Sequence, residues 1–285
     1  MMTVTSTDGE ELAAFTHGDA EKTPLVLLHG YPDDHTVWER VVPLLSDDFY
    51  VVTYDARGAG ESAHPASLSA YNLEQLSGDL LAVSEQVLGG RPFHLVGHDW
   101  GSIQSWESAT GARFAGKILS FTTISGPSLD SVANVIRRRI SRPRQLLKVV
   151  KPNWYVGAFH IPFLPEKFWE SYSAEKWQQR VAKEESDPDI PINPRATDNG
   201  AHGIKLYRAN FVPRILKPHP RKAICPVQAI APAGDSFVHP ALVKEMRRWV
   251  DDFTLTQVPG GHWAALSHPR DLAAAISRFA TAHGA

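Results

Sequence analysis

Short apolar runs alternate with longer amphipathic stretches along most of this chain. Near the start, Thr3 to Thr5 and Leu12 to Phe15 flank the turn residues Asp8 and Gly9, which predicts a β-hairpin. Further apolar runs predict buried strands at 24–28, 49–54, 93–96, 118–124, 226–230 and 253–258. Helix-length amphipathic segments stand between several of them, at 37–45, 71–88, 102–112, 240–250 and 270–282. Buried strands separated by helices indicate an α/β fold with a mostly parallel central sheet flanked by helices.

One interval interrupts this alternation. From Ser128 to about Lys217 no convincing buried strand occurs, while Trp, Pro, Arg and Phe become frequent. We therefore predict an inserted helical cap at 128–217, between a first core part at 1–127 and a second core part at 218–285. The prolines from Pro152 to Pro213 should divide this cap into short helices, because proline ends a helix at or before the preceding residue.

The composition narrows the possible partners and compartments. With 285 residues, of which 43% are hydrophobic, the chain fits one ordinary globular unit. A net charge of -2 gives no overall field for nucleic acid, so we expect no nucleic-acid partner. The single cysteine, Cys225, lies in an apolar run and is expected to be a buried thiol in a reducing compartment. Without a signal-like or membrane-length apolar stretch, we expect a cytoplasmic protein with no integral membrane segment; monomer and dimer both stay open.

The segment Phe93 to Ser102 has the pattern of a nucleophile elbow. It reads F-H-L-V-G-H-D-W-G-S, which is an apolar strand, a sharp turn and the opening of a helix. Glycines on both sides of Asp99 leave room where the strand reverses, so the Asp99 side chain should stand out at the helix N-terminus. The same G-x-D-x-G pattern also arises by chance, and its strand-turn-helix setting is what favours the functional interpretation.

Aspartate at this position changes the chemistry that is expected. A serine must lose a proton before it attacks, whereas an aspartate is already ionised at neutral pH. A carboxylate that attacks saturated carbon forms an ester on the enzyme, which an activated water must then hydrolyse. Asp99 thus predicts alkylation first and hydrolysis second.

Two later strand ends supply the other groups of a catalytic triad. His262 follows the last apolar run in the sequence V-P-G-G-H-W and is the expected general base. Asp235 follows the run before it, in A-P-A-G-D, and is expected to orient His262. The chain order Asp99, Asp235, His262 is that of nucleophile, acid and base in α/β-hydrolases. For each residue a structural role, as a turn aspartate or a hydrogen-bonding histidine, is the alternative.

The loop after the third strand completes the predicted machinery. In His29-Gly30-Tyr31-Pro32 the amide of Tyr31 can pair with the amide of Trp100 as an oxyanion hole. His29 is better interpreted as a structural residue of that loop, and His98 as a buried neighbour of the elbow.

Two other patterns are weaker. Gly58 to Ala63 matches a dinucleotide fingerprint and has Asp79 about twenty residues further on, but His64-Pro65 interrupts the helix that should receive the pyrophosphate. The basic run at 137–151 could touch an anionic lipid surface, although a solvated cap face is the simpler interpretation. We find no metal-ligand spacing and expect no cofactor and no metal.

Together these residues resemble the epoxide hydrolase branch of the α/β-hydrolase superfamily, over nearly the whole chain. The motifs that carry the resemblance are H-G-x-P at 29–32, D-x-R-G-x-G-x-S at 55–62 and G-H-D-W-G at 97–101. The chain also resembles the hydrolase half of actinobacterial fusions with a short-chain dehydrogenase; nothing dehydrogenase-like follows in this sequence, and whether the native protein continues stays open.

The resemblance implies an α/β-hydrolase fold with a cap, and a small apolar epoxide and water as substrates. It also implies two cap tyrosines, Tyr155 and Tyr207, that hold the epoxide oxygen from the side opposite Asp99. Packing within the cap is the alternative for both. The expected pocket residues are Trp38, Trp154, Phe159, His160 and Phe163, and His160 departs from the glutamine that is usual in the family.

Two alternatives stay open. Haloalkane dehalogenases share the aspartate and the following tryptophan, but Tyr31 stands where their second halide-binding side chain, typically an asparagine, is found; haloacetate dehalogenases have an arginine where this chain has Trp100. A ligand-binding protein without catalysis is the other alternative, because the fold does not fix the function.

Overall fold

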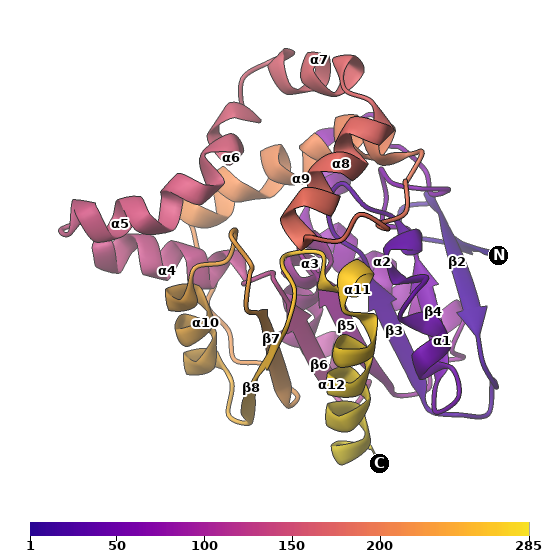
Figure 1. The fold of residues 1–285 in the computed structure, drawn as a ribbon. Coiled ribbons are helices and arrows are strands. Elements are labelled where there is room, and N and C mark those ends of the chain that lie inside the picture. Colours follow the sequence, from indigo (N-terminus) through magenta and orange to yellow (C-terminus); the bar gives the residue numbers. More distant parts are fainter. Residues whose placement is uncertain (285) are drawn as a thin grey trace.

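The computed structural model describes residues 1–284 and contains an eight-stranded sheet (Figure 1). The order of strands across the sheet is β1-β2-β4-β3-β5-β6-β7-β8. The strands are β1 (Met2–Thr5), β2 (Glu11–His17), β3 (Pro24–Leu28), β4 (Tyr50–Tyr54), β5 (Phe93–His98), β6 (Ile118–Ile124), β7 (Val227–Pro232) and β8 (Phe253–Val258). Each lies where an apolar run predicts it.

The pairing of these strands agrees with the sequence pattern. β1 and β2 form the predicted antiparallel hairpin, with Val4 opposite Leu12. β2 joins β4 in antiparallel orientation, and the pairings from β4 to β8 are all parallel. All five residues of β3 are buried, because helices cover both faces of the sheet and leave no face for polar side chains. The predicted α/β class and mostly parallel sheet are confirmed.

Two groups of helices cover the two faces of the sheet. Residues of α2 (Leu73–Gln86), α3 (Trp100–Ala109) and α10 (Pro240–Met246) form one apolar core with the strands. Residues of α1 (Val42–Leu45), α11 (Ala264–Ser267) and α12 (Pro269–Ala282) form the second core on the opposite face. Short 3₁₀ helices lie at His35–Trp38 (η1), Leu68–Tyr71 (η2), Ala112–Phe114 (η3), Lys151–Asn153 (η4) and Arg247–Trp249 (η5).

The segment predicted as one helix at 37–45 is instead two short pieces, η1 and α1. Pro43 stands in the first turn of α1, where its missing N–H and fixed φ are tolerated. A helix that ran through from residue 37 would need the N–H that proline lacks. The prediction of a single helix here was wrong for that reason.

Six α-helices follow β6 before the chain returns to β7, and Figure 1 shows them above one edge of the sheet. They are α4 (Leu129–Arg139), α5 (Pro143–Val150), α6 (Trp154–Ala158), α7 (Leu164–Ser171), α8 (Ala174–Glu185) and α9 (Ala196–Leu216). We refer to this segment as the cap, and its division from the core at residues 128 and 217 stays a prediction.

Prolines do not divide the whole cap into short helices. α9 is 21 residues long and contains Pro213 in its last turn. The helix continues to Leu216, and the amide of Lys217 still donates to the carbonyl of Pro213 at 2.9 Å. Proline removes only its own amide donor from the ladder, and here that loss falls next to the helix end. The expectation for Pro213 was therefore wrong.

The cysteine and the lengths of the helices were also subjects of the sequence predictions. Cys225 is buried, and this burial raises the pKa of its thiol to about 12, as expected for an inert side chain. Within residues 1–284, none of the helices combines the length and the apolar character that crossing a membrane requires.

Candidate active site

Asp99 occupies the sharp turn between β5 and α3. Its backbone has φ 50° and ψ -117°, a conformation that residues other than glycine rarely adopt. The turn is possible because Gly97 and Gly101 flank it closely. A Cβ on Gly101 would lie 2.2 Å from the carbonyl oxygen of Leu28, and one on Gly97 would lie 2.6 Å from that of Gly101. The sequence thus enforces the strained turn that presents the Asp99 carboxylate.

The structure brings Asp235 and His262 to the same edge of the sheet as Asp99. Asp235 follows β7 and His262 follows β8, and the carboxyl ends of parallel strands share one edge. His262 Nε2 lies 3.5 Å from Asp99 Oδ2, and His262 Nδ1 lies 3.4 Å from Asp235 Oδ1. The imidazole therefore stands between the two carboxylates and can exchange a proton on the side of Asp99.

The two carboxylates control the protonation of His262. Burial acts to lower the pKa of His262, but the Asp235 and Asp99 charges outweigh it and hold this pKa well above its ordinary value. Burial likewise acts to raise the pKa of Asp235, and the opposing His262 cation lowers it to about 2. Removal of either negative charge should therefore lower the pKa of His262.

The loop after β3 places an amide beside the nucleophile. The Tyr31 amide donates to Asp99 Oδ1 at 2.8 Å. Gly30 allows this approach, because a Cβ there would lie 2.5 Å from the Cβ of Asp99. Trp100, whose amide is the other predicted donor, begins α3 directly after Asp99. The Tyr31 hydroxyl points elsewhere, donating to the Gly200 carbonyl at 2.9 Å.

A cavity of about 250 Å³ lies between this edge of the sheet and the cap. Polar side chains in its wall include Asp99, His262, Asn153, Tyr155 and Tyr207. Most of the remaining wall is apolar: Trp100, Ile103, Pro127, Leu129, Val132, Ile136, Val149, Val150, Val156, Phe211, Ile215, Phe237, Val238 and Leu242. Asp99, His262 and both cap tyrosines thus face one largely apolar space.

Both cap tyrosines are neutral donors in this cavity. Tyr155 lies on α6 and Tyr207 on α9, with ring centroids 6.1 Å apart. Burial raises the pKa of both hydroxyls above the ordinary tyrosine value, and the Asp99 charge adds to the shift. The Tyr155 hydroxyl donates to Asn153 Oδ1 at 3.3 Å, and Asn153 is itself held by the Phe237 carbonyl at 3.1 Å. Asn153, which orients Tyr155, is not among the residues that the sequence predicts for the site.

The five residues expected to line the pocket lie elsewhere. Trp38 is fully buried in the apolar core that α1, α11 and α12 form with the sheet. Trp154 and Phe163 are 72% and 74% exposed on the outside of the cap. Phe159 packs behind the ring of Tyr207 at 4.8 Å, and His160 bonds to the Val156 carbonyl at 2.8 Å. None of them belongs to the cavity wall. The prediction was wrong because the packing of the cap helices, which no local pattern reveals, decides which face turns inward.

Glu185 is a residue of the site that the sequence analysis missed. It ends α8 in the cap and is 5% exposed. Its carboxylate accepts from the amides of Gly261 at 2.9 Å and Trp263 at 2.8 Å, and from the Ser267 hydroxyl at 2.5 Å. Both neighbours of His262 in the chain are therefore held by one cap side chain. An acidic residue in a charged amphipathic helix carries no signal of this role, since its partners lie 76 or more residues away.

Replacing Glu185 by Ala should lower the free energy of unfolding by about 3 kcal/mol, because hydrogen bonds to a charged group contribute about 1.5–3 kcal/mol each and two buried amides would lose their acceptor. Denaturant unfolding measures this loss. The matched control is Glu184→Ala, which removes the adjacent glutamate, whose bond is to the Ser236 hydroxyl at 3.1 Å. Equal losses in the two variants would contradict the assignment.

Asp33 is a second group that the sequence analysis missed. It accepts from Trp263 Nε1 at 3.1 Å, and burial together with the Asp99 and Asp34 charges raises its pKa to about 7. His98 lies nearby and donates from Nε2 to the His262 carbonyl at 2.8 Å. Asp33 thus holds Trp263, the residue after His262, and His98 holds the backbone carbonyl of His262. The sequence predicts His98 as a buried residue beside the elbow, and it is buried.

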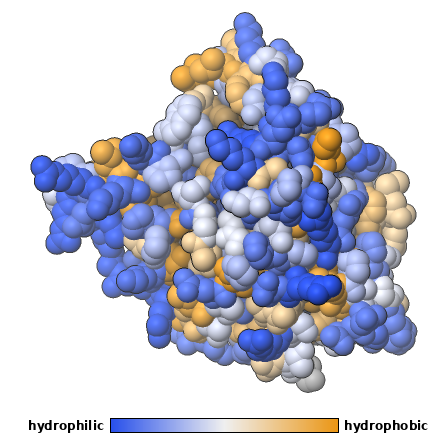
Figure 2. All heavy atoms as spheres, in the orientation of Figure 1, coloured by the Kyte–Doolittle hydropathy of each residue, from blue (hydrophilic) through white to orange (hydrophobic). Residues whose placement is uncertain are grey.

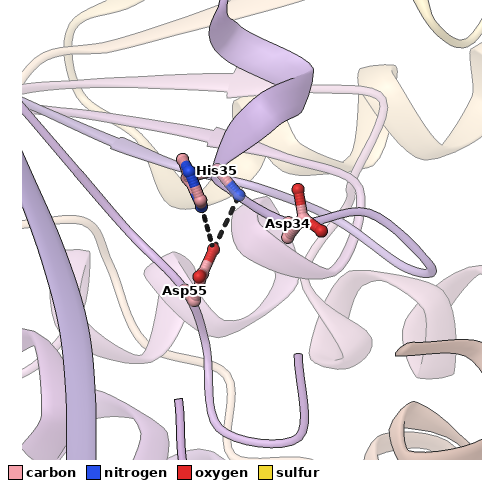
Figure 3. Close-up of side chains that lie close together, drawn as sticks. All are labelled: Asp34, His35 and Asp55. Atoms are coloured by element: carbon pink, nitrogen blue, oxygen red, sulfur yellow. Dashed lines mark hydrogen bonds and ion pairs between the residues drawn. The ribbon is translucent and has the colours of Figure 1, made fainter. Parts of the chain in front are cut away.

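Asp34, His35 and Asp55 form a group with the composition of a cation site (Figure 3). Their side chains already have other partners, however. Asp55 Oδ1 accepts from the amide of His35 at 2.7 Å and from its Nδ1 at 2.8 Å. Asp34 Oδ2 accepts from the side-chain amides of Asn193 and Asn199 in the cap, each at 3.0 Å. We interpret this group as a structural link between a core loop and the cap.

The residues of the apparent dinucleotide fingerprint also have structural partners. Asp79, the candidate ribose ligand, accepts from Arg57 Nε at 2.7 Å. Arg57 NH1 donates in turn to Asp8 at 2.7 Å in the first hairpin. The Gly60 amide donates to Asn199 of the cap at 2.9 Å. These bonds hold the turn after β4 against neighbouring elements.

Comparison with known proteins agrees with this fold. The family described as "alpha/beta hydrolase fold" matches residues 23–269. "Probable oxidoreductase EphD" of Mycobacterium tuberculosis is 32% identical over 288 residues, which cover 97% of this chain but 49% of that protein. The chain thus spans about half the length of these relatives. "Epoxide hydrolase 3" of Xenopus tropicalis is 25% identical over 281 residues, covering 92% of this chain and 72% of that protein.

Among solved structures, the epoxide hydrolase of Bacillus megaterium in complex with an inhibitor has a TM-score of 0.81 at 20% identity. The match covers 98% of this chain and 100% of that one, and it shows a shared fold. The fold and the resemblance predicted from the motifs are confirmed. The chain therefore belongs to the alpha/beta hydrolase fold family, and its relatives include proteins named as epoxide hydrolases.

Proposed function

We propose that this protein hydrolyses epoxides to vicinal diols through a covalent ester on Asp99. The observation that carries the proposal is one cavity whose wall contains a carboxylate nucleophile, a histidine beside it and two neutral tyrosine hydroxyls. Relatives named as epoxide hydrolases support the substrate class. Within this cavity each group has a distinct task.

In the first step an Asp99 oxygen attacks an epoxide carbon, and the bond between that carbon and the epoxide oxygen breaks. The electron pair of the broken bond goes to the oxygen, which takes a proton from Tyr155 or Tyr207 and becomes the first hydroxyl of the product. Burial keeps both phenols protonated until this moment, so they can donate. The nucleophile needs no base, because it is already an anion.

The second step needs a base, and the first step creates one. Ester formation neutralises Asp99, which removes one of the two charges that hold the pKa of His262 high. The proton that leaves His262 goes to the tyrosinate produced by ring opening, which restores the phenol. Neutral His262 can then take a proton from a water molecule as that water attacks the ester carbonyl. The amides of Tyr31 and Trp100 stabilise the resulting oxyanion, and Asp235 stabilises the returning imidazolium. Cleavage of the bond between the carbonyl carbon and the ester oxygen then releases the second oxygen of the diol. This oxygen takes the proton of the new carboxyl group, which regenerates the Asp99 carboxylate.

The cavity wall also limits the substrate. Around the reacting groups the wall consists mostly of aliphatic and aromatic side chains, and no lysine or arginine lines it. A charged substituent on the substrate would lose its hydration without gaining a partner. We therefore propose a small apolar epoxide as the substrate.

Single turnover in heavy-oxygen water tests the mechanism. With enzyme in excess, water oxygen should enter the Asp99 carboxylate, while the diol keeps an unlabelled oxygen from Asp99. Mass spectrometry of the product and of the peptide that contains Asp99 measures both. Label that passes directly into the diol in the first turnover would rule out the ester.

One observation favours a dehalogenase as the second candidate. Trp100 Nε1 is buried and has no hydrogen-bond partner among residues 1–284, so it could donate to a halide. The second donor of such a site is not at Tyr31, whose hydroxyl is bonded to Gly200 outside the cavity. Assaying a panel of haloalkanes beside epoxides, with halide and diol release as the two readouts, separates the candidates.

A further inference from the structure

The end of α4, the following turn and α5 form a projecting part of the cap with an unusual charge. Residues 137–151 contain seven basic residues and no acidic one, in a chain with a net charge of -2. The basic residues are Arg137, Arg138, Arg139, Arg142, Arg144, Lys148 and Lys151. We refer to residues 137–154 as the basic hairpin. It projects at the left of Figures 1 and 2, where blue side chains dominate around an orange patch.

Most of these basic side chains form no ion pair with a carboxylate among residues 1–284. Arg138 lies 4.0 Å from the Glu245 carboxylate, and Arg137 donates to the carbonyl of Leu216 at 3.0 Å. The other five basic side chains form no ion pair with a carboxylate in the part of the chain that is described. Because the rest of the chain is net acidic, the positive charge is concentrated on this one projection.

Large apolar side chains are exposed among these charges. Ile140 is 72% exposed, Leu147 is 58% exposed, and Trp154, three residues after Lys151, is 72% exposed. The inner side of α5 is already packed, since Val149 joins Val135 and Leu242 in a buried cluster. The exposed residues therefore belong to an outer face that packing within the chain leaves uncovered. Of the 17 large hydrophobic side chains exposed in residues 1–284, four lie in the basic hairpin.

We propose that the basic hairpin docks on the surface of an anionic lipid bilayer. Lysine and arginine side chains are attracted to anionic headgroups, and apolar side chains between them insert at the boundary with the acyl chains. Tryptophan is favoured at that boundary because its ring is both apolar and a hydrogen-bond donor. Nucleic acid would match the charge equally well, but it gives no role to exposed Ile140 and Leu147. The net acidic remainder of the chain is repelled by the same surface and so orients the molecule.

Docking in this way would place the cavity next to the bilayer. Val149 and Val150 of α5 line the cavity that contains Asp99. The same helix thus has the proposed lipid contact on its outer face and the cavity wall on its inner face. The docking itself does not depend on the proposed function, since neither the charges nor the exposed side chains involve the catalytic groups.

Vesicle co-sedimentation with the intact chain tests the proposal. We expect binding to vesicles made of phosphatidylcholine and phosphatidylglycerol in equal parts, weakening as salt is added, and little binding to phosphatidylcholine alone. The double variant Arg142→Glu/Lys148→Glu should lower the partition coefficient at least about twenty-five-fold, because each basic residue near an anionic surface contributes about fivefold. Ile140→Ser/Leu147→Ser should weaken binding without changing the charge.

The matched control is Arg270→Glu/Arg278→Glu, which makes the same change in net charge on exposed positions of α12. All variants change exposed residues, and circular dichroism checks that they fold. Equal losses of vesicle binding in the hairpin and control variants would overturn the proposal. Equal binding to vesicles with and without phosphatidylglycerol would also overturn it. Concentration-dependent self-association that Leu147→Ser abolishes, without vesicle binding, would assign the face to a second copy of the chain and also overturn it.

Discussion

The His262→Gln variant should consume one equivalent of epoxide and then stop. Asp99 can still form the ester, because it needs no base, but no group remains to activate water. We expect kcat to fall at least about 10³-fold, within the range that general-base catalysis contributes. Rapid quenching followed by intact-protein mass spectrometry should show a mass increase equal to that of the substrate, located on the peptide that contains Asp99.

Two further variants make this result specific. Asp99→Asn should give neither adduct nor diol, which separates loss of the nucleophile from loss of the base. His202→Gln makes the same side-chain change at a cap residue outside the cavity and should leave the turnover unchanged. Diol that accumulates from His262→Gln at the original rate, with no adduct on Asp99, would remove the ester from the mechanism.

The double variant Tyr155→Phe/Tyr207→Phe should lose epoxide opening almost entirely. In the proposed mechanism each hydroxyl donates to the oxygen that gains charge as the ring opens, and removal of one such donor typically lowers the rate by about 10²–10³-fold. Without both, we expect the rate of ester formation to fall by about 10⁴-fold or more. Single-turnover consumption of epoxide measures this step directly, separately from ester hydrolysis.

Tyr172→Phe is the matched control for the tyrosine variants. It removes a hydroxyl from another aromatic residue of the cap. The Tyr172 ring stacks on the ring of Phe168, with 4.8 Å between the centroids, and Tyr172 does not line the cavity. Its single-turnover rate should equal that of the unmodified protein. If the double variant opened epoxides as fast as this control, the tyrosines would have only a packing role.

The comparison of sequence and structure shows which information is local. The sheet could be predicted because each strand is a separate apolar run, and the elbow because Gly97 and Gly101 bracket Asp99 within five residues. Asp235 and His262 could be predicted from their position after strands, since parallel strands bring their carboxyl ends to one edge. These predictions needed a pattern and a rule of topology, and no knowledge of side-chain packing.

The pocket wall and the supporting residues could not be predicted in this way. Trp154 and Phe163 are as aromatic as any pocket residue, yet the rotation of short cap helices turns them outward. Glu185 and Asn153 act through partners that are distant in the chain, and nothing in their own neighbourhood distinguishes them from solvent-facing polar residues. Tertiary packing alone decides these roles.

The contact of Glu185 with the His262 loop fixes one side of the cap, at α8, to the core. α8 is tied to the loop on both sides of the base, so it cannot swing away without disturbing the hydrogen bonds that position the imidazole. Figure 1 shows α5 on the far side of the cap from α8. Because α4, α5 and α6 carry no such contact with the His262 loop, we expect any rearrangement of the cap that leaves the imidazole aligned to involve that side.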